Sequence, residues 1–523
     1  MAETSTTTSF INGSSSIASL AADHLFTILL LLPMDSILSF AMTCKKFRYL
    51  ATSDILWESV CRRDWGNTAV DALKSSFHDD EQRRLIPWIR LYKQVSRVDS
   101  VCCYKLAEPD PDLVLPVPRA SHSLNFVSGC LVLFGGGYEG AVIVSFEFSK
   151  ISTNSIICLT LVGYLENHIH DMKNTAFYGA SSGFGFSKMI SELFELLLPL
   201  GRDLDDTWAV YIGNNSQNML KWQKIQTGTP SGRFGHTCVV IENYLVLFGG
   251  INERGDRHSD TWLGQVSLHE NLGISLSWQL LDVGSTSPPP RGAHAACCIS
   301  SRKMVIHGGI GLNGVRLDDT WIIELSENRC YGTWRKIVSH PSPPARSGHS
   351  LTCIGETQTI LFGGRGLGYE VLNDIWVLHV TEGYSKWVQI FYELQNIPAG
   401  VSLPRVGHSA TSIIGGRLLI HGGEDSLRHR KDDFWVLDIS HISLEKMHPT
   451  RLNSKRMLAN KWRRLKPEGY KPGCRSFHRA CVDDSGRYLY VFGGMVDGLL
   501  QPAEPVGLRF DGELFLVELV LQL

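Results

Sequence analysis

This 523-residue chain lacks long apolar runs, paired cysteines and an excess of charge of either sign. Its formal net charge is −2, which removes the usual basis for binding nucleic acid or a membrane surface. The N-terminal stretch MAETSTTTSF has neither the basic nor the apolar part of a secretory signal. The apolar run Leu25–Leu32 is too short to cross a bilayer. We therefore expect a soluble protein of the cytoplasm or nucleus, with no nucleic-acid partner and no membrane partner.

The chemical motifs of several enzyme classes are also missing. The 13 cysteines are an odd number and include no C-x-x-C pair, which favours reduced thiols over a disulfide framework or a zinc site. The sequence contains no G-x-x-x-x-G-K-[ST] loop for phosphates and no H-E-x-x-H zinc motif. We therefore expect no catalytic residue, no metal and no cofactor.

The first hundred residues divide by composition and by apolar spacing. Residues 1–16 are rich in Ser and Thr, and we expect them to be disordered. Residues 17–65 predict three short helices, which begin near Asp23, Asp35 and Asp54. Such a unit is small for a core of its own and leaves an apolar face for a partner. Residues 66–100 read as a polar loop and then a spacer helix, whose shared face comprises Trp88, Leu91, Tyr92 and Val95.

The order of apolar residues between Leu20 and Trp65 resembles an F-box. The matching elements are Ile28-Leu29, Leu32-Pro33, Ile37-Leu38, Cys44-Lys45 and Trp57. The chain departs from the family pattern at Leu20-Ala21, where the family has Leu-Pro, and at Phe47, where Trp is commoner. Each of these residues alone is better explained as core, whereas the ordered set favours the F-box.

The F-box resemblance implies a partner. Such units dock on a Skp-type adaptor and, through it, on a cullin ubiquitin ligase. Carried over residue by residue, the resemblance implies that the adaptor contacts Leu25, Leu29, Leu32, Pro33, Ile37, Leu38 and Cys44.

From residue 101 onward the chain is periodic. An Arg is followed three residues later by a His six times, in the pairs Arg119/His122, Arg233/His236, Arg291/His294, Arg346/His349, Arg405/His408 and Arg475/His478. A Gly-Gly pair follows each His after 13 to 15 residues, and in four repeats a Trp lies 13 residues past the first Gly. A fixed spacing of this kind indicates a repeat architecture.

These repeats resemble kelch repeats, and the resemblance implies a mainly β fold. We expect a six-bladed kelch β-propeller over residues 101–523, with the His strand innermost in each four-stranded blade. The last repeat has Phe515 in place of its first Trp and no outer strand. Val101–Leu106 is expected to supply that strand, with Tyr104 in the position of the second Trp, and so to close the ring.

The first repeat contains an extra segment. Removing 60 residues, about 141–200, restores the spacing of the other repeats. The segment has no Arg, Gln or Trp. It is either a surface insertion or translated non-coding sequence, and its composition favours the second interpretation.

The repeated histidines would be spread around a ring, so packing explains them better than a metal does. The loops after the glycine pairs are basic and would form a rim suited to an acidic or phosphorylated segment of a partner. The rim residues are Arg254, Arg257, Arg316, Arg365, Arg428, Arg430 and Lys431. Solvation, or pairing with the adjacent Asp, is the explanation that the sequence favours for these charges, because exposed ion pairs contribute little and need no function.

The combination is similar to plant F-box/kelch-repeat proteins, some of which carry a flavin-binding light sensor. We expect no such sensor here, because the first sixteen residues cannot hold one. The leading hypothesis is a non-catalytic substrate receptor of a cullin-type ubiquitin ligase, which binds an unidentified protein. A kelch scaffold without a ligase role and a propeller metalloenzyme are the alternatives.

Overall fold

The computed structural model describes residues 17, 20–76, 86–106, 114–138, 202–212, 220–225, 228, 230–269, 273–393, 403–439, 457–459, 462–497 and 508–521. The expected disordered tail, 1–16, and the expected extra segment, 141–200, lie outside these residues. Within the described part of the chain, no helix is both long enough and apolar enough to span a membrane.

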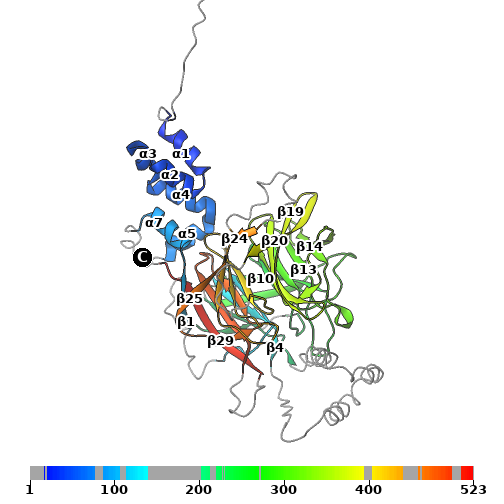
Figure 1. Ribbon diagram of the computed structural model, residues 1–523. Coiled ribbons are helices and arrows are strands. Elements are labelled where there is room, and N and C mark those ends of the chain that lie inside the picture. The colour runs from blue at the N-terminus through cyan, green and yellow to red at the C-terminus, as the bar shows by residue number, and fades with distance from the viewer. Residues whose placement is uncertain are drawn as a thin grey trace, which may run out of the picture.

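The described α-helices all precede the sheets. They are α1 (Ala22–Leu30), α2 (Met34–Ala41), α3 (Lys45–Ala51), α4 (Asp54–Trp65), α5 (Asn67–Ser76) and α7 (Trp88–Ser96). Helices α1 to α3 lie at the end remote from the strands, whereas α5 and α7 lie next to the strands (Figure 1).

The helix boundaries differ from the expected ones in two places. The single helix expected from Asp35 is interrupted after Ala41 and continues as α3, and α5 forms in a segment expected to be a loop. The expected cap Asp54 is not the cap of α4, because the Ser53 hydroxyl accepts the Leu56 N–H at 3.4 Å. Asp54 instead accepts the backbone N–H of Trp88 at 2.6 Å, which ties α4 to the start of α7.

The rest of the chain forms six four-stranded antiparallel blades, so the expected kelch propeller is confirmed. From the inside outward, the first blade contains β2 (Ser123–Val127), β3 (Cys130–Phe134), β6 (Thr207–Tyr211) and β7 (Gln223–Ile225), and the second contains β8 (Thr237–Ile241), β9 (Tyr244–Phe248), β10 (Thr261–His269) and β11 (Gly273–Leu280). The third blade contains β12 (Ala295–Ile299), β13 (Lys303–His307), β14 (Thr320–Leu325) and β15 (Gly332–Ile337), and the fourth contains β17 (Ser350–Cys353), β18 (Gln358–Gly366), β19 (Val371–Thr381) and β20 (Tyr384–Glu393). The fifth blade contains β21 (Ser409–Ile413), β22 (Arg417–His421), β23 (Phe434–Asp438) and β25 (Trp462–Gly469), and the last contains β27 (Arg479–Val482), β28 (Tyr488–Asp497), β29 (Leu508–Leu519) and β1 (Ser100–Lys105).

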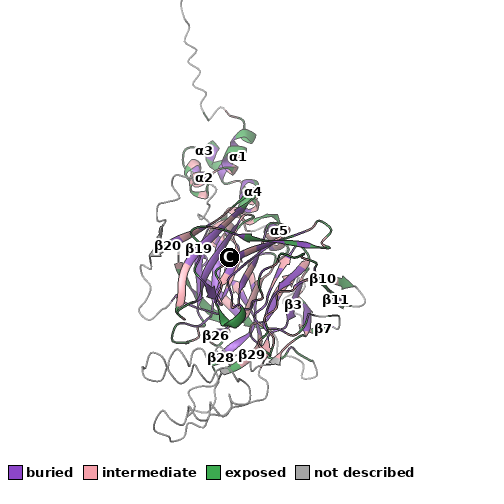
Figure 2. Cartoon of the chain, turned by 90° about the vertical axis from the view of Figure 1, so that its right-hand side faces the viewer, coloured by how far each residue is buried: buried purple, intermediate pink, exposed green. Residues whose placement is uncertain are grey.

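Short strands complete the sheets. They are β4 (Gly137–Tyr138), β5 (Arg202–Asp203), β16 (Arg346–Ser347), β24 (Met457–Ala459) and β26 (Arg475–Ser476). The buried residues follow the blades, and exposed residues concentrate on loops and on the outer parts of the helices (Figure 2). Pairing of β4 with β5 brings together described residues on either side of the extra segment.

A closed circle of backbone hydrogen bonds surrounds the propeller axis. Its members, which we call the axial ring, are Ser121, Gly235, Ala293, Gly348, Gly407 and Phe477, one from each blade. Each N–H donates to the carbonyl oxygen of the preceding member at 2.6 to 2.9 Å, and the Ser121 N–H closes the circle by donating to Phe477. Because every ring donor has an acceptor, the blades are held in one fixed order.

The N-terminal strand closes the propeller as expected. β1 pairs antiparallel with β29 from Val101↔Leu519 to Lys105↔Phe515, and in parallel with β25. Phe515 occupies the place of the first Trp, because it pairs with Val491 as Trp321 pairs with Ile306. This pairing removes the open edges of the last blade.

Tyr104 does not take the place of the second Trp. That residue pairs two positions past the first Trp, as Trp334 does with Ile323, and in the last blade this position is Cys103. A shift of one residue turns a side chain to the opposite face, which explains why Tyr104 is 44% exposed and Cys103 is buried. Phe434 compensates for the missing indole, since it is fully buried and stacks on His421 at 4.2 Å.

Candidate functional site: a helical docking surface and an axial cavity

The N-terminal helices share a small apolar core. Trp57 is fully buried at its centre, and its indole N–H donates to the Ala51 carbonyl at 2.8 Å. Phe47, where the F-box pattern commonly has Trp, is buried and stacks on Phe40 at 4.2 Å. The departure at Phe47 therefore preserves an aromatic core position.

Three of the residues expected to contact an adaptor belong to this core. Leu25, Leu29 and Ile37 are at most 1% exposed, so they hold the helices together and are not accessible to a partner. Leu32 and Leu38 are half-buried, whereas Pro33 and Cys44 are exposed. Only these last four expected residues reach the surface.

Exposed apolar side chains that are not among the expected adaptor contacts also lie on or between helices α1 to α4. They are Ile28, Leu31, Met42, Tyr49 and Ile55, of which Leu31 and Tyr49 are 81% and 83% exposed. Leu31, Leu32, Pro33, Leu38, Met42, Cys44 and Tyr49 together are called the docking surface below. Large apolar side chains exposed on a small helical unit are typical of a protein–protein contact. Their place in the sequence could have indicated this exposure, because these residues fall between the helices or opposite the buried positions of a helix.

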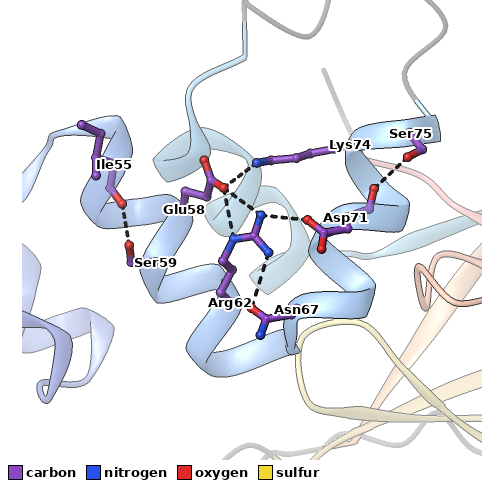
Figure 3. Close-up of polar contacts among 8 residues, drawn as sticks. All are labelled: Ile55, Glu58, Ser59, Arg62, Asn67, Asp71, Lys74 and Ser75. Carbon is purple, nitrogen blue, oxygen red and sulfur yellow. Dashed lines mark hydrogen bonds and ion pairs between the residues drawn. The ribbon is translucent and has the colours of Figure 1, made fainter.

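A charged network fastens α5 to α4 (Figure 3). Glu58 accepts from Arg62 at 3.0 Å and also pairs with Lys74, and Arg62 reaches Asp71 at 2.8 Å. Burial opposes ionisation of Glu58, yet its hydrogen bonds to Lys74 and Arg62 prevail and lower its pKa. The network thus holds together the two helices that lead to the propeller.

Helix α7 packs on both units. Trp88 and Tyr92 pack against the core of the N-terminal helices, and the Tyr92 ring stacks on Trp65 at 5.3 Å. Leu91 and Val95 belong to a buried cluster that also contains residues of the last two blades and of β1. The helix is therefore a structural bridge between the propeller and helices α1 to α3, which lie at the end remote from the strands (Figure 1).

The repeated arginines have a structural role. In the third blade, Arg291 binds both carboxylate oxygens of Asp319 at 2.6 and 2.9 Å and donates to the Gly308 carbonyl. Asp319 also accepts the Trp321 indole N–H at 2.7 Å. Although burial opposes ionisation, the Arg291 hydrogen bonds prevail and lower the Asp319 pKa. Gly308 is required beside this pair, because a Cβ there would lie 2.7 Å from the Arg346 carbonyl oxygen.

The repeated histidines are buried and uncharged. Burial, followed by the charge of Arg291, lowers the pKa of His294 far below its usual range. His294 shares a 2.7 Å hydrogen bond with Thr237 of the neighbouring blade, so it links blades. Among the described residues, no group of three or more His, Cys, Asp or Glu is arranged to hold a metal.

Only some of the residues expected to form a basic rim are accessible to solvent. Arg254 and Arg428 are exposed and Arg257, Arg430 and Lys431 half-buried, but Arg316 and Arg365 are buried. Arg316 stacks over Tyr369 at 4.4 Å, and Arg365 pairs with Glu424 at 3.0 Å. Lys431 pairs with Asp425 at 2.7 Å and not with the adjacent Asp432.

A cavity of about 910 Å³ follows the propeller axis. Its lining runs from the loops after the glycine pairs, past the axial ring, to the middle of the innermost strands. The sequence analysis missed Arg479 in this lining. The signal was present, because the residue after the repeated His is Ser, Thr or Ala in the other repeats and Arg only here.

Comparison with known proteins agrees with this two-part architecture. Residues 23–63 match the F-box-like profile, and residues 269–456 match the KLHDC2/KLHL20/DRC7 Kelch-repeats domain. The Arabidopsis thaliana F-box/kelch-repeat protein At1g51550 is 54% identical over 97% of this chain and 93% of its own length. Adagio protein 3 of Arabidopsis thaliana is 25% identical over 89% of this chain, which spans 60% of that protein. The solved structure titled "Structure of YjhT" aligns with a TM-score of 0.43 and 13% identity, covering 76% of this chain and 95% of that one.

Proposed function

Because the chain belongs to the F-box/kelch-repeat proteins, we propose that it is the substrate-recognition subunit of a Skp/cullin/F-box ubiquitin ligase. In this role the docking surface binds a Skp-type adaptor, and through it a cullin, while the propeller binds a protein substrate. The chain itself makes and breaks no bond, since its contribution is to hold a substrate near the ubiquitin-conjugating enzyme. Its place of action is the cytoplasm or the nucleus.

One observation carries this proposal: the helices that expose the docking surface are fixed to the propeller by α7. Val95 is buried against the propeller, and the Arg417 guanidinium of β22 donates to the Val95 and Ser96 carbonyl oxygens. A receptor must keep its substrate at a defined distance and orientation from the adaptor, and a helix packed on both units supports this requirement.

The direct test is binding of the full-length protein to a purified Skp-type adaptor by isothermal titration calorimetry. The test variant combines Leu31→Asp with Pro33→Asp. Pro33 precedes α2, and Asp is a favoured residue at that cap position, so the helix is retained. Leu280→Asp, at an exposed apolar site of the propeller, is the matched control.

We expect the double variant to bind about a hundredfold more weakly, because each buried apolar side chain contributes about 1.5 to 3 kcal/mol. The control should bind like the wild type. Unchanged binding of the double variant would show that the docking surface is misassigned. Absence of adaptor binding by the wild type would overturn the ligase role and leave a kelch scaffold.

A further inference from the structure

Arg479 places a positive charge inside the axial cavity. The equivalent residues of the other blades are Ser123, Thr237, Ala295, Ser350 and Ser409, all small. Arg479 lies two residues past Phe477 of the axial ring, which corresponds to roughly 7 Å along an extended chain. Its side chain lines the cavity together with the hydroxyl-bearing residues of the neighbouring blades.

The protein itself does not neutralise this guanidinium. The Arg479 Nε donates to the His122 carbonyl at 2.8 Å, and within the described part of the chain no carboxylate lies at ion-pair distance. Burial lowers its pKa to about 10, so it remains protonated near neutrality. A half-buried cation without a carboxylate carries a desolvation cost, and an anion that entered the cavity would relieve that cost.

The acidic groups that line the cavity are already engaged. Glu424 lies 3.0 Å from Arg365 and 3.8 Å from Arg430, and Arg430 also reaches Asp497. Arg428 lines the same mouth. Among the described residues, neither Glu424 nor Asp497 pairs with Arg479, so this guanidinium adds a positive charge to the cavity that attracts anions.

Apolar side chains are exposed on the loops that contribute Ile310, Arg365 and Arg428 to the cavity lining. The loops after the glycine pairs of the third, fourth and fifth blades expose Leu312, Val315, Leu367 and Leu427, each at least 55% exposed. Exposed apolar side chains on the loops that carry Arg365 and Arg428 suit a polypeptide segment that has apolar residues on either side of an anionic one. These apolar side chains would contribute nothing to the binding of a free inorganic anion.

We propose that the axial cavity binds an anionic oxygen group, a side-chain carboxylate or a phosphate, on a segment of the protein substrate, with Arg479 as its charged anchor. That the segment belongs to a ubiquitination substrate rests on the proposed function. The anion site itself follows from the cavity and its charges.

The first experiment uses inorganic phosphate and the full-length chain. Thermal melting is followed with and without phosphate for the wild type, Arg479→Gln, Arg479→Lys and Arg254→Gln. Arg254 is an exposed loop arginine outside the cavity lining and serves as the matched control. Phosphate stabilises proteins in general, so the quantity compared is the difference in melting shift between variants.

We expect phosphate to raise the melting temperature of the wild type and Arg254→Gln more than that of Arg479→Gln. Arg479→Lys should recover part of the shift, because Lys retains the charge but not the planar donor geometry. Equal shifts in all four proteins would overturn the proposal. If Arg479→Gln does not fold, the phosphate-induced melting shift of Arg479→Lys is compared with that of the wild type. Equal shifts in these two proteins would likewise overturn the proposal.

The second experiment identifies the source of the anion. Capped Gly-Leu-X-Leu-Gly peptides, with phosphoserine, Glu or Gln as X, are titrated into wild type and Arg479→Gln. The phosphoserine or the Glu peptide should bind the wild type at least about tenfold more tightly than the variant, and the Gln peptide should not distinguish them. No preference for either anionic peptide over the Gln peptide would overturn the assignment to a substrate segment.

Adaptor binding is measured on the same preparations, because this separates the two proposals. Adaptor binding without Arg479-dependent anion binding would overturn the cavity site and leave the proposed function intact. Arg479-dependent anion binding without adaptor binding would support the site and overturn the ligase role.

Discussion

Acidification is expected to destabilise the propeller through its repeated histidines. Burial lowers the native pKa of His408 to about 3, with Arg405 as the second cause, and burial also lowers the pKa of the other repeated histidines. In the unfolded chain, His titrates near 6.5. Below about pH 6.5 the unfolded state therefore binds more protons than the native state. Their contribution to stability is present above that pH and is lost as the pH falls toward the native pKa.

The magnitude follows from the number of buried groups. Each such histidine costs about 1.4 kcal/mol for every pH unit below 6.5. The six repeated histidines are at most 7% exposed, so little of this cost is screened by solvent. Together they remove about 8 kcal/mol per pH unit, which is comparable to the total stability of about 5 to 15 kcal/mol of a typical protein. The Arg-paired aspartates add little here, since their carboxylates titrate at lower pH.

The assay is thermal unfolding, followed by near-ultraviolet circular dichroism at constant ionic strength between about pH 7.5 and 5.5. We expect the melting temperature to fall steeply below about pH 6.5. Replacing His340, which is exposed in a loop, by Gln should leave this pH dependence unchanged. A melting temperature that stays constant down to about pH 5.5 would refute the reasoning, as would native histidine resonances that titrate near 6.5.

Three further predictions concern the supporting structure. Asp319→Asn leaves a buried guanidinium without its carboxylate and should lower the free energy of unfolding, measured by urea denaturation, by about 3 to 5 kcal/mol. Asp318→Asn, at the exposed neighbouring position, should leave the free energy of unfolding unchanged. Equal effects of the two substitutions would contradict the pairing role of Asp319. Gly415→Ala should loosen the packing of α7 and raise its rate of amide hydrogen exchange, because a Cβ at Gly415 would lie 2.6 Å from a side chain of that helix. Gly383→Ala is the control, since Gly383 has a similar φ and open space around it. Unchanged exchange in α7 would contradict its role as a bridge. Deletion of residues 141–200 should leave the melting temperature and adaptor binding unchanged, because β4 and β5 bring the flanking chain together, and a large loss of stability would show that the segment packs on the propeller.

The repeat architecture was predictable because it depends on spacing. Arg, His and the glycine pair each satisfy a backbone or charge requirement that recurs in every blade, so their separation in sequence reports the blade directly. The closing strand was predictable for a related reason, since an incomplete last repeat and a surplus first strand must pair. The error at Tyr104 arose because equal spacing does not fix the face of a strand to within one residue.

The docking surface was less predictable. The F-box pattern selects residues that matter, but a pattern does not separate a leucine that holds helices together from one that meets a partner. Leu29 and Leu31 are two residues apart, yet one is 1% and the other 81% exposed. Their positions depend on how three short helices pack, and apolar spacing in one helix cannot report this. Arg479 was missed because one unusual residue among repeats is visible only after the blades are superimposed.

The pairing of β1 with β29 has a consequence for synthesis of the protein. The first strand of the sheet region leaves the ribosome before its antiparallel partner, which is made only after the strands of the other five blades. Until then the N-terminal helices are attached to a propeller that is not yet closed and has two unpaired strand edges. A prematurely terminated chain would therefore carry the helices without a finished substrate platform, and its unpaired edges would mark it for the cell's quality-control machinery.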